Sequence, residues 1–125
     1  MKKTLFMITL VIISFLINGC STKTTPDRVI ESLTIYSEDE VNVAMDIAEK
    51  YFKKNFRGSE LKTIKYDEEL SANDINYYSS IYEVSESDIM CLDIFFSQEG
   101  YDDFREYILV RNDYGKWKIK DCGYP

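Results

Sequence analysis

The chain has 125 residues and is acidic, with 22 Asp and Glu residues against 15 Lys and Arg residues and a net charge of −7. This balance argues against nucleic-acid binding, because contacts to phosphate depend on clustered Lys and Arg. The sequence contains no histidine, so it lacks both the commonest general base at neutral pH and the commonest zinc ligand. The length suits one folded domain.

The first twenty residues have the organisation of a secretory signal. Lys2 and Lys3 precede an apolar run over residues 5–17, and the run leads into Leu16-Ile17-Asn18-Gly19-Cys20. A membrane-spanning helix needs about 20 apolar residues, and this run is shorter, so a signal peptide is the better interpretation. The segment resembles the lipobox of bacterial prolipoproteins, in which an aliphatic residue lies three positions before the cysteine and a small residue lies directly before it.

This resemblance implies that residues 1–19 are a cleaved signal peptide and that the thiol of Cys20 carries a diacylglyceryl group. The acyl chains, such as palmitate, would hold the protein at the extracytoplasmic face of the cell membrane, with each buried methylene contributing about 0.8 kcal/mol. Residues 20–27 would form the lipidated N-terminus and a polar tether, and residues 28–125 a single α+β domain. Removal of Lys2 and Lys3 leaves 13 of the 15 basic residues against 22 acidic residues, a net charge of −9.

The clearest folded element is an amphipathic helix that begins after Ser37. The Ser37 hydroxyl can cap the first helical amides, and Glu40 stands at the position that completes a capping box. The apolar side chains recur at three- and four-residue steps and form a face wide enough to pack on a sheet; they are Val41, Ala44, Met45, Ala48, Tyr51, Phe52 and Phe56. Gly58 ends the helix. For residues 28–36, a helical turn and a strand both remain open.

Four strands are predicted after the helix. The first covers residues 61–66, and residues 71–86 are expected to be mostly irregular, with a short helix over residues 73–80 as the alternative. Residues 88–97 form the strongest strand, apolar on both faces and therefore central in the sheet.

The last two strands form a hairpin. A turn over residues 98–103 leads to a strand over residues 104–111. The sequence Asn112-Asp113-Tyr114-Gly115 is a strong hairpin signal before a final strand over residues 116–122.

This order predicts an α+β fold in which one long amphipathic helix packs on a curled antiparallel sheet of about four strands. Residues spread over most of the body resemble the small nuclear transport factor 2-like, or cystatin-like, domains of Gram-positive lipoproteins: Tyr51-Phe52, Asn55-Phe56, Gly58, Leu61, Ile64, Tyr66-Asp67-Glu68-Glu69, Ile108-Leu109-Val110-Arg111, Gly115-Lys116-Trp117-Lys118 and Gly123-Tyr124. These are mainly packing and turn positions. The resemblance therefore implies a fold and assigns no catalytic residue or cofactor.

The predicted central strand supplies the candidate binding surface. Its face with Ile89, Asp93 and Phe95 has no predicted helix to cover it, so a protein, peptide or envelope ligand, or a second copy of the chain, is expected there. The favoured function is a non-enzymatic binding or accessory domain. An enzyme with an acidic site is the alternative, with Asp93 as its candidate carboxylate, and a surface lipoprotein without a discrete ligand is the third.

Two further sets of residues could carry site chemistry. Residues 67–69, three consecutive acids, are expected to be a solvated strand end, and no metal site is predicted. If Cys20 carries lipid, Cys91 and Cys122 remain as a pair that can form a disulfide outside the cytoplasm. Strand alternation places both on one side of the sheet. In a simple meander, however, the intervening strand separates them by about 9 to 10 Å, which favours two free thiols.

Overall fold

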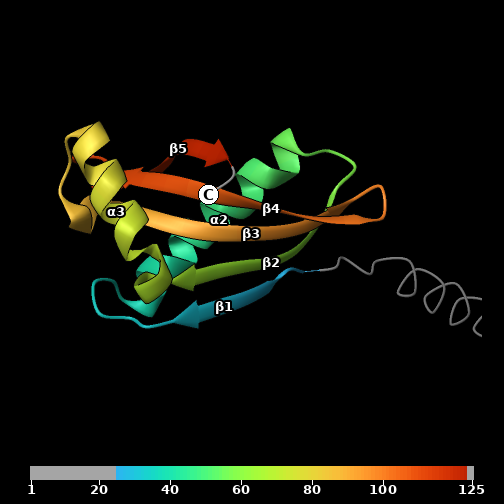
Figure 1. The fold of residues 1–125 in the computed structure, drawn as a ribbon, viewed down its shortest axis with the longest axis horizontal. Coiled ribbons are helices and arrows are strands. Elements are labelled where there is room, and N and C mark those ends of the chain that lie inside the picture. The colour runs from blue at the N-terminus through green and yellow to red at the C-terminus, as the bar shows by residue number, and fades with distance from the viewer. Residues whose placement is uncertain (1–24, 124–125) are drawn as a thin grey trace, which may run out of the picture.

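The computed structural model describes residues 25–123, which form one five-stranded sheet with a helix on each face (Figure 1). In chain order the elements are β1 (Asp27–Glu31), α2 (Glu38–Asn55), β2 (Glu60–Asp67), α3 (Glu68–Tyr82), the short 3₁₀ helix η1 (Glu86–Asp88), β3 (Ile89–Gln98), β4 (Tyr101–Arg111) and β5 (Trp117–Gly123). The prediction of an α+β fold with a long helix packed on the sheet is confirmed. None of the helices in this part of the chain is long and apolar enough to cross a membrane.

The sheet is mixed, and its strands lie in sequence order from β1 to β5. β2 to β5 are antiparallel neighbours, whereas β1 runs parallel to β2 with Asp27 opposite Thr63. A parallel pair requires a crossover connection, and α2 is that connection. The prediction of about four antiparallel strands therefore missed one strand, the parallel edge strand β1. Most of β1 lies within residues 28–36, for which the sequence allows either a helical turn or a strand.

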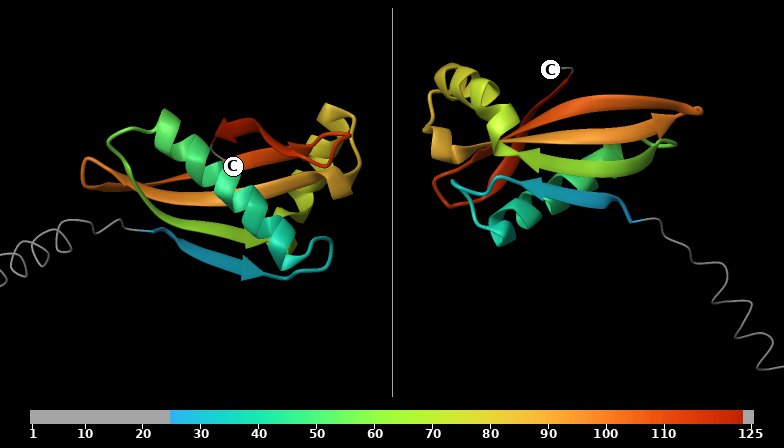
Figure 2. Two further views of the ribbon diagram at one scale, coloured as in Figure 1. Left: turned by 180° about the vertical axis from the view of Figure 1, so that it is seen from behind. Right: turned by 60° about the horizontal axis from the view of Figure 1, so that its bottom comes forward.

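Helix α2 is positioned as the sequence predicts. The Ser37 hydroxyl accepts a hydrogen bond from the Glu40 amide at 3.2 Å, and acidic residues occupy the first turn while Lys53 and Lys54 occupy the last, which suits the helix dipole. The helix crosses one face of the sheet diagonally (Figure 2). Its buried face joins the main core, which contains Tyr36, Val41, Ala44, Met45, Ala48, Phe52, Leu61, Ile64, Tyr66, Met90, Leu92, Ile94, Phe96, Tyr107, Leu109 and Trp117.

Helix α3 overturns the expectation that residues 71–86 are mostly irregular. Asp67 caps this helix by accepting a hydrogen bond from the Leu70 amide at 3.2 Å. The buried positions Ser71, Ile75 and Ser79 recur every four residues, so the helix does present one face to the sheet. Only Ile75 of the three is aliphatic, and a search for apolar periodicity therefore misses it.

The two helices lie on opposite faces of the sheet and cover unequal parts of it (Figures 1 and 2). A second, smaller apolar cluster lies beneath α3 and contains Ile75, Ile89, Cys91, Ile108 and Val110. The far end of this face, near the turn between β3 and β4, lies beyond the helix, and Phe95 there is 37% exposed. The part of the sheet that α3 covers is therefore the end that contains the start of β3.

The turn between β3 and β4 is tighter than the predicted turn over residues 98–103. Only Glu99 and Gly100 separate the two strands, and both have positive φ, at 53° and 81°. A two-residue connection of this kind matches the twist of a hairpin. β4 consequently begins at Tyr101, three residues earlier than expected, and the register places Asp93 opposite Glu106.

Candidate functional site

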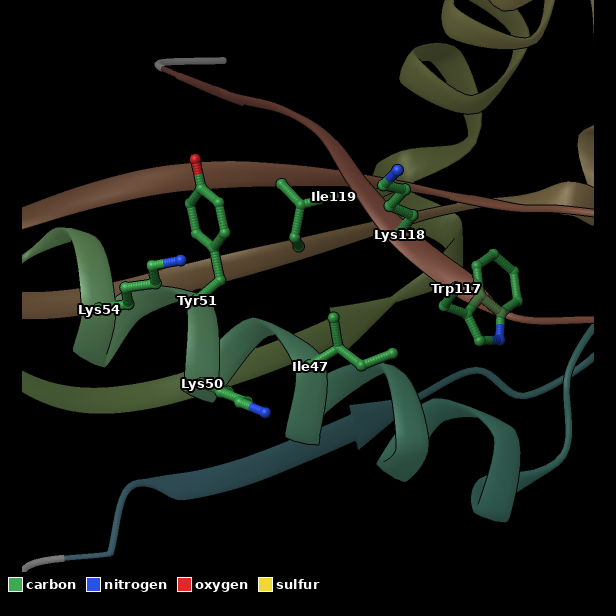
Figure 3. Close-up of a pocket in the computed structure, with 7 residues that line it drawn as sticks. All are labelled: Ile47, Lys50, Tyr51, Lys54, Trp117, Lys118 and Ile119. Atoms are coloured by element: carbon green, nitrogen blue, oxygen red, sulfur yellow. The ribbon is translucent and has the colours of Figure 1, made fainter.

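A groove of about 440 Å³ lies between α2 and β5 (Figure 3). Seven residues line it: Ile47, Lys50, Tyr51 and Lys54 from the helix, and Trp117, Lys118 and Ile119 from the strand. The volume falls within the usual range for sites that take small molecules. The groove is therefore the candidate ligand site of the described residues.

The local structure explains why these residues line one groove. Residues 47, 50, 51 and 54 are spaced three and four apart and share one side of α2. In β5, Trp117 and Ile119 are two residues apart and face the helix together, while Lys118 projects away from it (Figure 3). Because β5 is an edge strand, the groove opens at the border of the main core.

Trp117 forms one end of the groove and packs against two other side chains. Its ring meets Tyr36 edge-on with 5.4 Å between centroids, and the Arg111 guanidinium lies 5.1 Å from its ring centroid. Arg111 is itself fixed by Asp88 at 3.1 Å. The Trp117 ring thus presents a positioned apolar surface rather than a mobile side chain.

The Tyr51 end of the groove contains polar groups. The Tyr51 hydroxyl lies 3.5 Å from the Cys122 sulfur, and its ring meets Tyr107 edge-on with centroids 5.4 Å apart. The Cys122 hydrogen bond and partial burial raise the pKa of Tyr51, so its hydroxyl remains protonated at neutral pH. The buried Tyr107 hydroxyl has no hydrogen-bond partner among residues 25–123.

The lysines that line the groove have no ion pairs among the described residues. On α2, Lys53 pairs with Glu49 at 3.5 Å, whereas Lys50 and Lys54 have no ion pair within the described residues. In Figure 3 the Lys54 side chain extends toward the Tyr51 ring. The groove therefore combines an apolar floor with unpaired positive charge, on a chain whose net charge is negative.

The two cysteines lie on opposite faces of the sheet, which corrects the prediction that they share one side. Cys91 belongs to the cluster beneath α3, whereas Cys122 packs against the main core beneath α2. The cause is a register shift in β5: Ile119 pairs with Leu109, but Asp121 pairs with Ile108. One extra residue in a bulge reverses the facing of everything after it. Both cysteines are free thiols.

Helix α3 covers only one end of the predicted binding surface, which consists of Ile89, Asp93 and Phe95. Ile89 is fully buried beneath the helix, so it is not a surface residue of this domain. Asp93 is half-buried, and Phe95 stacks on Phe104 with centroids 5.0 Å apart. A ligand was expected on this face because no helix was predicted to cover it. That reason no longer holds for the part of the face that α3 covers.

Two acidic residues that the sequence did not mark as a pair, Asp93 and Glu106, lie opposite each other on this second face. Glu106 is only 7% exposed, and burial followed by a hydrogen bond to Asp74 raises its pKa from 4.5 to about 8. Burial also raises the pKa of Asp93 opposite, against the attraction of Lys65. Burial and the neighbouring carboxylates therefore favour the protonated form of Glu106 over the ionised form. The signal that could have identified it was Glu99-Gly100, since a two-residue turn there sets the Asp93 and Glu106 pairing.

Of residues 67–69, which were expected to be a solvated strand end, only Glu69 is exposed. Asp67 and Glu68 are buried. Glu68 accepts hydrogen bonds from the Thr34 hydroxyl, the Tyr66 hydroxyl at 2.9 Å and the amides of Thr34 and Ile35. Burial alone would raise the pKa of Glu68, but these hydrogen bonds outweigh it and lower the pKa. The carboxylate fastens the β1–α2 loop to the start of α3.

Cys20, the predicted lipidation site, lies outside the described residues. Within residues 25–123, no group of three or more Cys, Asp or Glu side chains is placed to hold a metal ion. Comparisons of the chain with protein-family models, with curated proteins and with solved structures find no match.

Proposed function

We propose that the chain is an extracytoplasmic lipoprotein, anchored to the cell membrane through Cys20, whose folded body is a non-enzymatic binding domain. The basic residues Lys2 and Lys3, the apolar run and the Gly19-Cys20 junction support the anchor. Labelled palmitate should enter the wild-type protein and not Cys20→Ala. Equal labelling of both chains, or of neither, contradicts the anchor.

The groove between α2 and β5 supports the binding function best. It brings an apolar floor, a positioned tryptophan and unpaired lysines together in about 440 Å³. The ligand is a protein segment, a peptide or another envelope molecule that places an apolar group against Ile47, Trp117 and Ile119.

An anionic apolar dye, anilinonaphthalene sulfonate, tests this site directly. Trp117 is the single tryptophan of the chain, so a dye in the groove should accept its excitation energy. Ile119→Gln should abolish this transfer, whereas the matched change Ile81→Gln, at an exposed apolar residue on α3, should leave it intact. Dye binding that depends on Ile81 instead places the binding surface on α3. No binding by either chain favours a surface lipoprotein without a discrete ligand.

We further propose that the domain has the nuclear transport factor 2-like fold. The long helix α2 packed across the antiparallel strands β2 to β5 supports this assignment. An experimental structure whose α2 and β2 to β5 superpose on such a domain tests it, and a different strand order contradicts it.

A small enzyme with an acidic site is the second candidate, and one observation favours it. The pKa of Glu106 is raised to about 8 beside a half-buried Asp93, and raised carboxyl pKa values are typical of general acids. Turnover of chromogenic glycosides or esters that is lost in Glu106→Gln would support this candidate. The absence of turnover across such a panel contradicts it.

A homodimer through the second face depends on its uncovered end. Phe95 and Phe104 remain there as a stacked pair. Sedimentation at rising protein concentration should show dimers that Phe95→Ser dissociates. A wild-type chain that stays monomeric at high concentration contradicts the dimer.

A further inference from the structure

The groove has two chemically different parts, and together they specify a class of ligand. This inference rests on the proposed binding function of the groove. The geometry points to an anionic amphiphile, an apolar chain or ring that ends in a carboxylate, as the ligand held between α2 and β5, with its carboxylate beside Tyr51 and Lys54.

The charge of the ligand follows from which lysines are left unpaired. Lys53, Lys62 and Lys65 each lie within 4 Å of a carboxylate, at 3.5, 3.2 and 3.6 Å. Three unpaired lysines, Lys50, Lys54 and Lys118, have no such partner among residues 25–123 and border the groove together. Lys116 and Lys120 also have none within this part of the chain, but they do not line this groove. In a chain with an excess of seven acidic residues, three lysines without a carboxylate partner around one groove favour an anion.

The position of the anionic group follows from the hydrogen-bond donors. The Tyr51 hydroxyl lies at the groove with only the Cys122 sulfur as its partner, at 3.5 Å, and a thiol is a weak partner for a hydroxyl. The Tyr51 ring packs edge-on against Tyr107, whose own buried hydroxyl has no partner among the described residues. A carboxylate accepts hydrogen bonds from a phenol and from an ammonium group at once.

The apolar part of the ligand follows from the floor of the groove. Ile47, Trp117 and Ile119 meet the ligand with side chains alone, and the α2 backbone has no free donor there because its amides are bonded within the helix. A peptide could pair with the free backbone edge of β5, but the amides that it set against this floor would face apolar surface, which is costly. An acyl chain or an aromatic ring carries no such groups, so a small amphiphile fits the floor better.

Emission from Trp117 provides the test, because the chain has a single tryptophan and it lies in the groove. The full chain, reconstituted in phosphatidylcholine liposomes, is titrated with decanoate, decanol, decyltrimethylammonium and acetate. Decanoate should shift the emission at about tenfold lower concentration than decanol. The cationic probe and acetate should shift it least, because one has the wrong charge and the other has no apolar body.

Variants separate the charge from the hydrogen bond. Lys50→Gln with Lys54→Gln should bring the decanoate response close to that of decanol, and Tyr51→Phe should weaken decanoate alone by about threefold to tenfold. Lys53→Gln is the matched control, because Lys53 lies on the same helix, is exposed and does not line the groove. Its response to decanoate should equal that of wild type.

Each result bears on either the inference or the groove itself. Equal responses to decanoate, decanol and the cationic probe overturn the anionic ligand and leave the groove as an apolar site. A shift produced by a leucine-containing acidic peptide and not by decanoate overturns the amphiphile in favour of a peptide. The absence of a shift with every probe overturns both the inference and the proposed function.

Discussion

The two faces of the sheet differ in what they bury. The face beneath α2 holds sixteen buried hydrophobic residues in one cluster, including five from the helix, one from the loop before it and three from β2. The face beneath α3 holds five, and beside them lie Asp74, Asp93 and Glu106. The residues that stabilise the fold and the residues that respond to pH therefore lie on different faces of the sheet. Apolar burial on the first face holds the fold, and titratable groups on the second face couple α3 to pH.

Truncation of the first face should have the largest effect. Leu92→Ala removes a fully buried side chain from the main core and should lower the free energy of unfolding by about 2 to 5 kcal/mol. Chemical denaturation measures this. Leu70→Ala, at a residue that is 68% exposed on α3, is the control and should change stability by less than about 0.5 kcal/mol. Similar losses in both variants would erase the contrast between core and surface.

The same truncation on the second face should have a smaller and more local effect. Ile75→Ala removes the one aliphatic side chain among the four buried residues of α3 and should cost about 2 kcal/mol, the low end for such changes. Hydrogen exchange should accelerate in α3 while the amides of α2 keep their protection. Equal acceleration in both helices would mean that the two faces open as one unit.

The pH dependence should follow the second face. The pKa of Glu106 is raised from 4.5 to about 8, so between these values the folded state holds a proton that the unfolded state has lost. The stability this proton gives is complete below about 4.5 and is lost as pH rises toward 8, with a slope of up to about 1.4 kcal/mol per pH unit. Denaturation across this range measures the slope. Glu106→Gln should flatten it, whereas Asp102→Asn, at an exposed residue of the same strand, should not.

Glu68 should give the opposite sign at lower pH. Its pKa is lowered by its hydrogen bonds, so its contribution is present above the ordinary value of 4.5 and is lost as pH falls through its folded pKa. Glu68→Gln should therefore lower stability by a constant amount above that range and flatten only the acid limb of the stability profile. A changed slope above pH 6 in this variant would mean that Glu68 contributes to the pH dependence assigned to Glu106.

The smallest expected effect concerns the cap of α2. Ser37→Ala removes the side-chain oxygen that accepts from the Glu40 amide and should cost about 1 kcal/mol, measured as a shift in the denaturation midpoint. Ser37→Gly should cost only a few tenths of a kcal/mol. A loss as large as that of Leu92→Ala would show that the cap, rather than the core, decides whether the first face forms.

The sequence predicts the first face well because its signals are local and apolar. Ser37 marks the start of α2, and the spacing of residues such as Ala44, Met45 and Phe52 marks its buried side. The second face depends on features that leave no such pattern. Ser71 and Ser79 are buried because small residues let α3 approach the sheet, and serine otherwise indicates a loop.

The candidate groove could not be predicted from the sequence either, because it depends on how two elements pack together. Ile47 and Tyr51 are recognisable as residues of an apolar helix face, and Trp117 and Ile119 as the buried side of a strand. Nothing in the sequence says that these two sets meet at the edge of the sheet. The bulge that turns Cys122 toward Tyr51 cannot be predicted from the sequence either, because it depends on the pairing of β5 with β4.

Hydrogen exchange of the full chain in phosphatidylcholine liposomes, with and without decanoate, tests the central claim that the groove between α2 and β5 is the ligand site. We expect added protection in the second half of α2 and in β5, with α3 and the start of β3 unchanged. Protection that appears in α3 or β3 and not in β5 would contradict it, because the ligand would then lie on the second face.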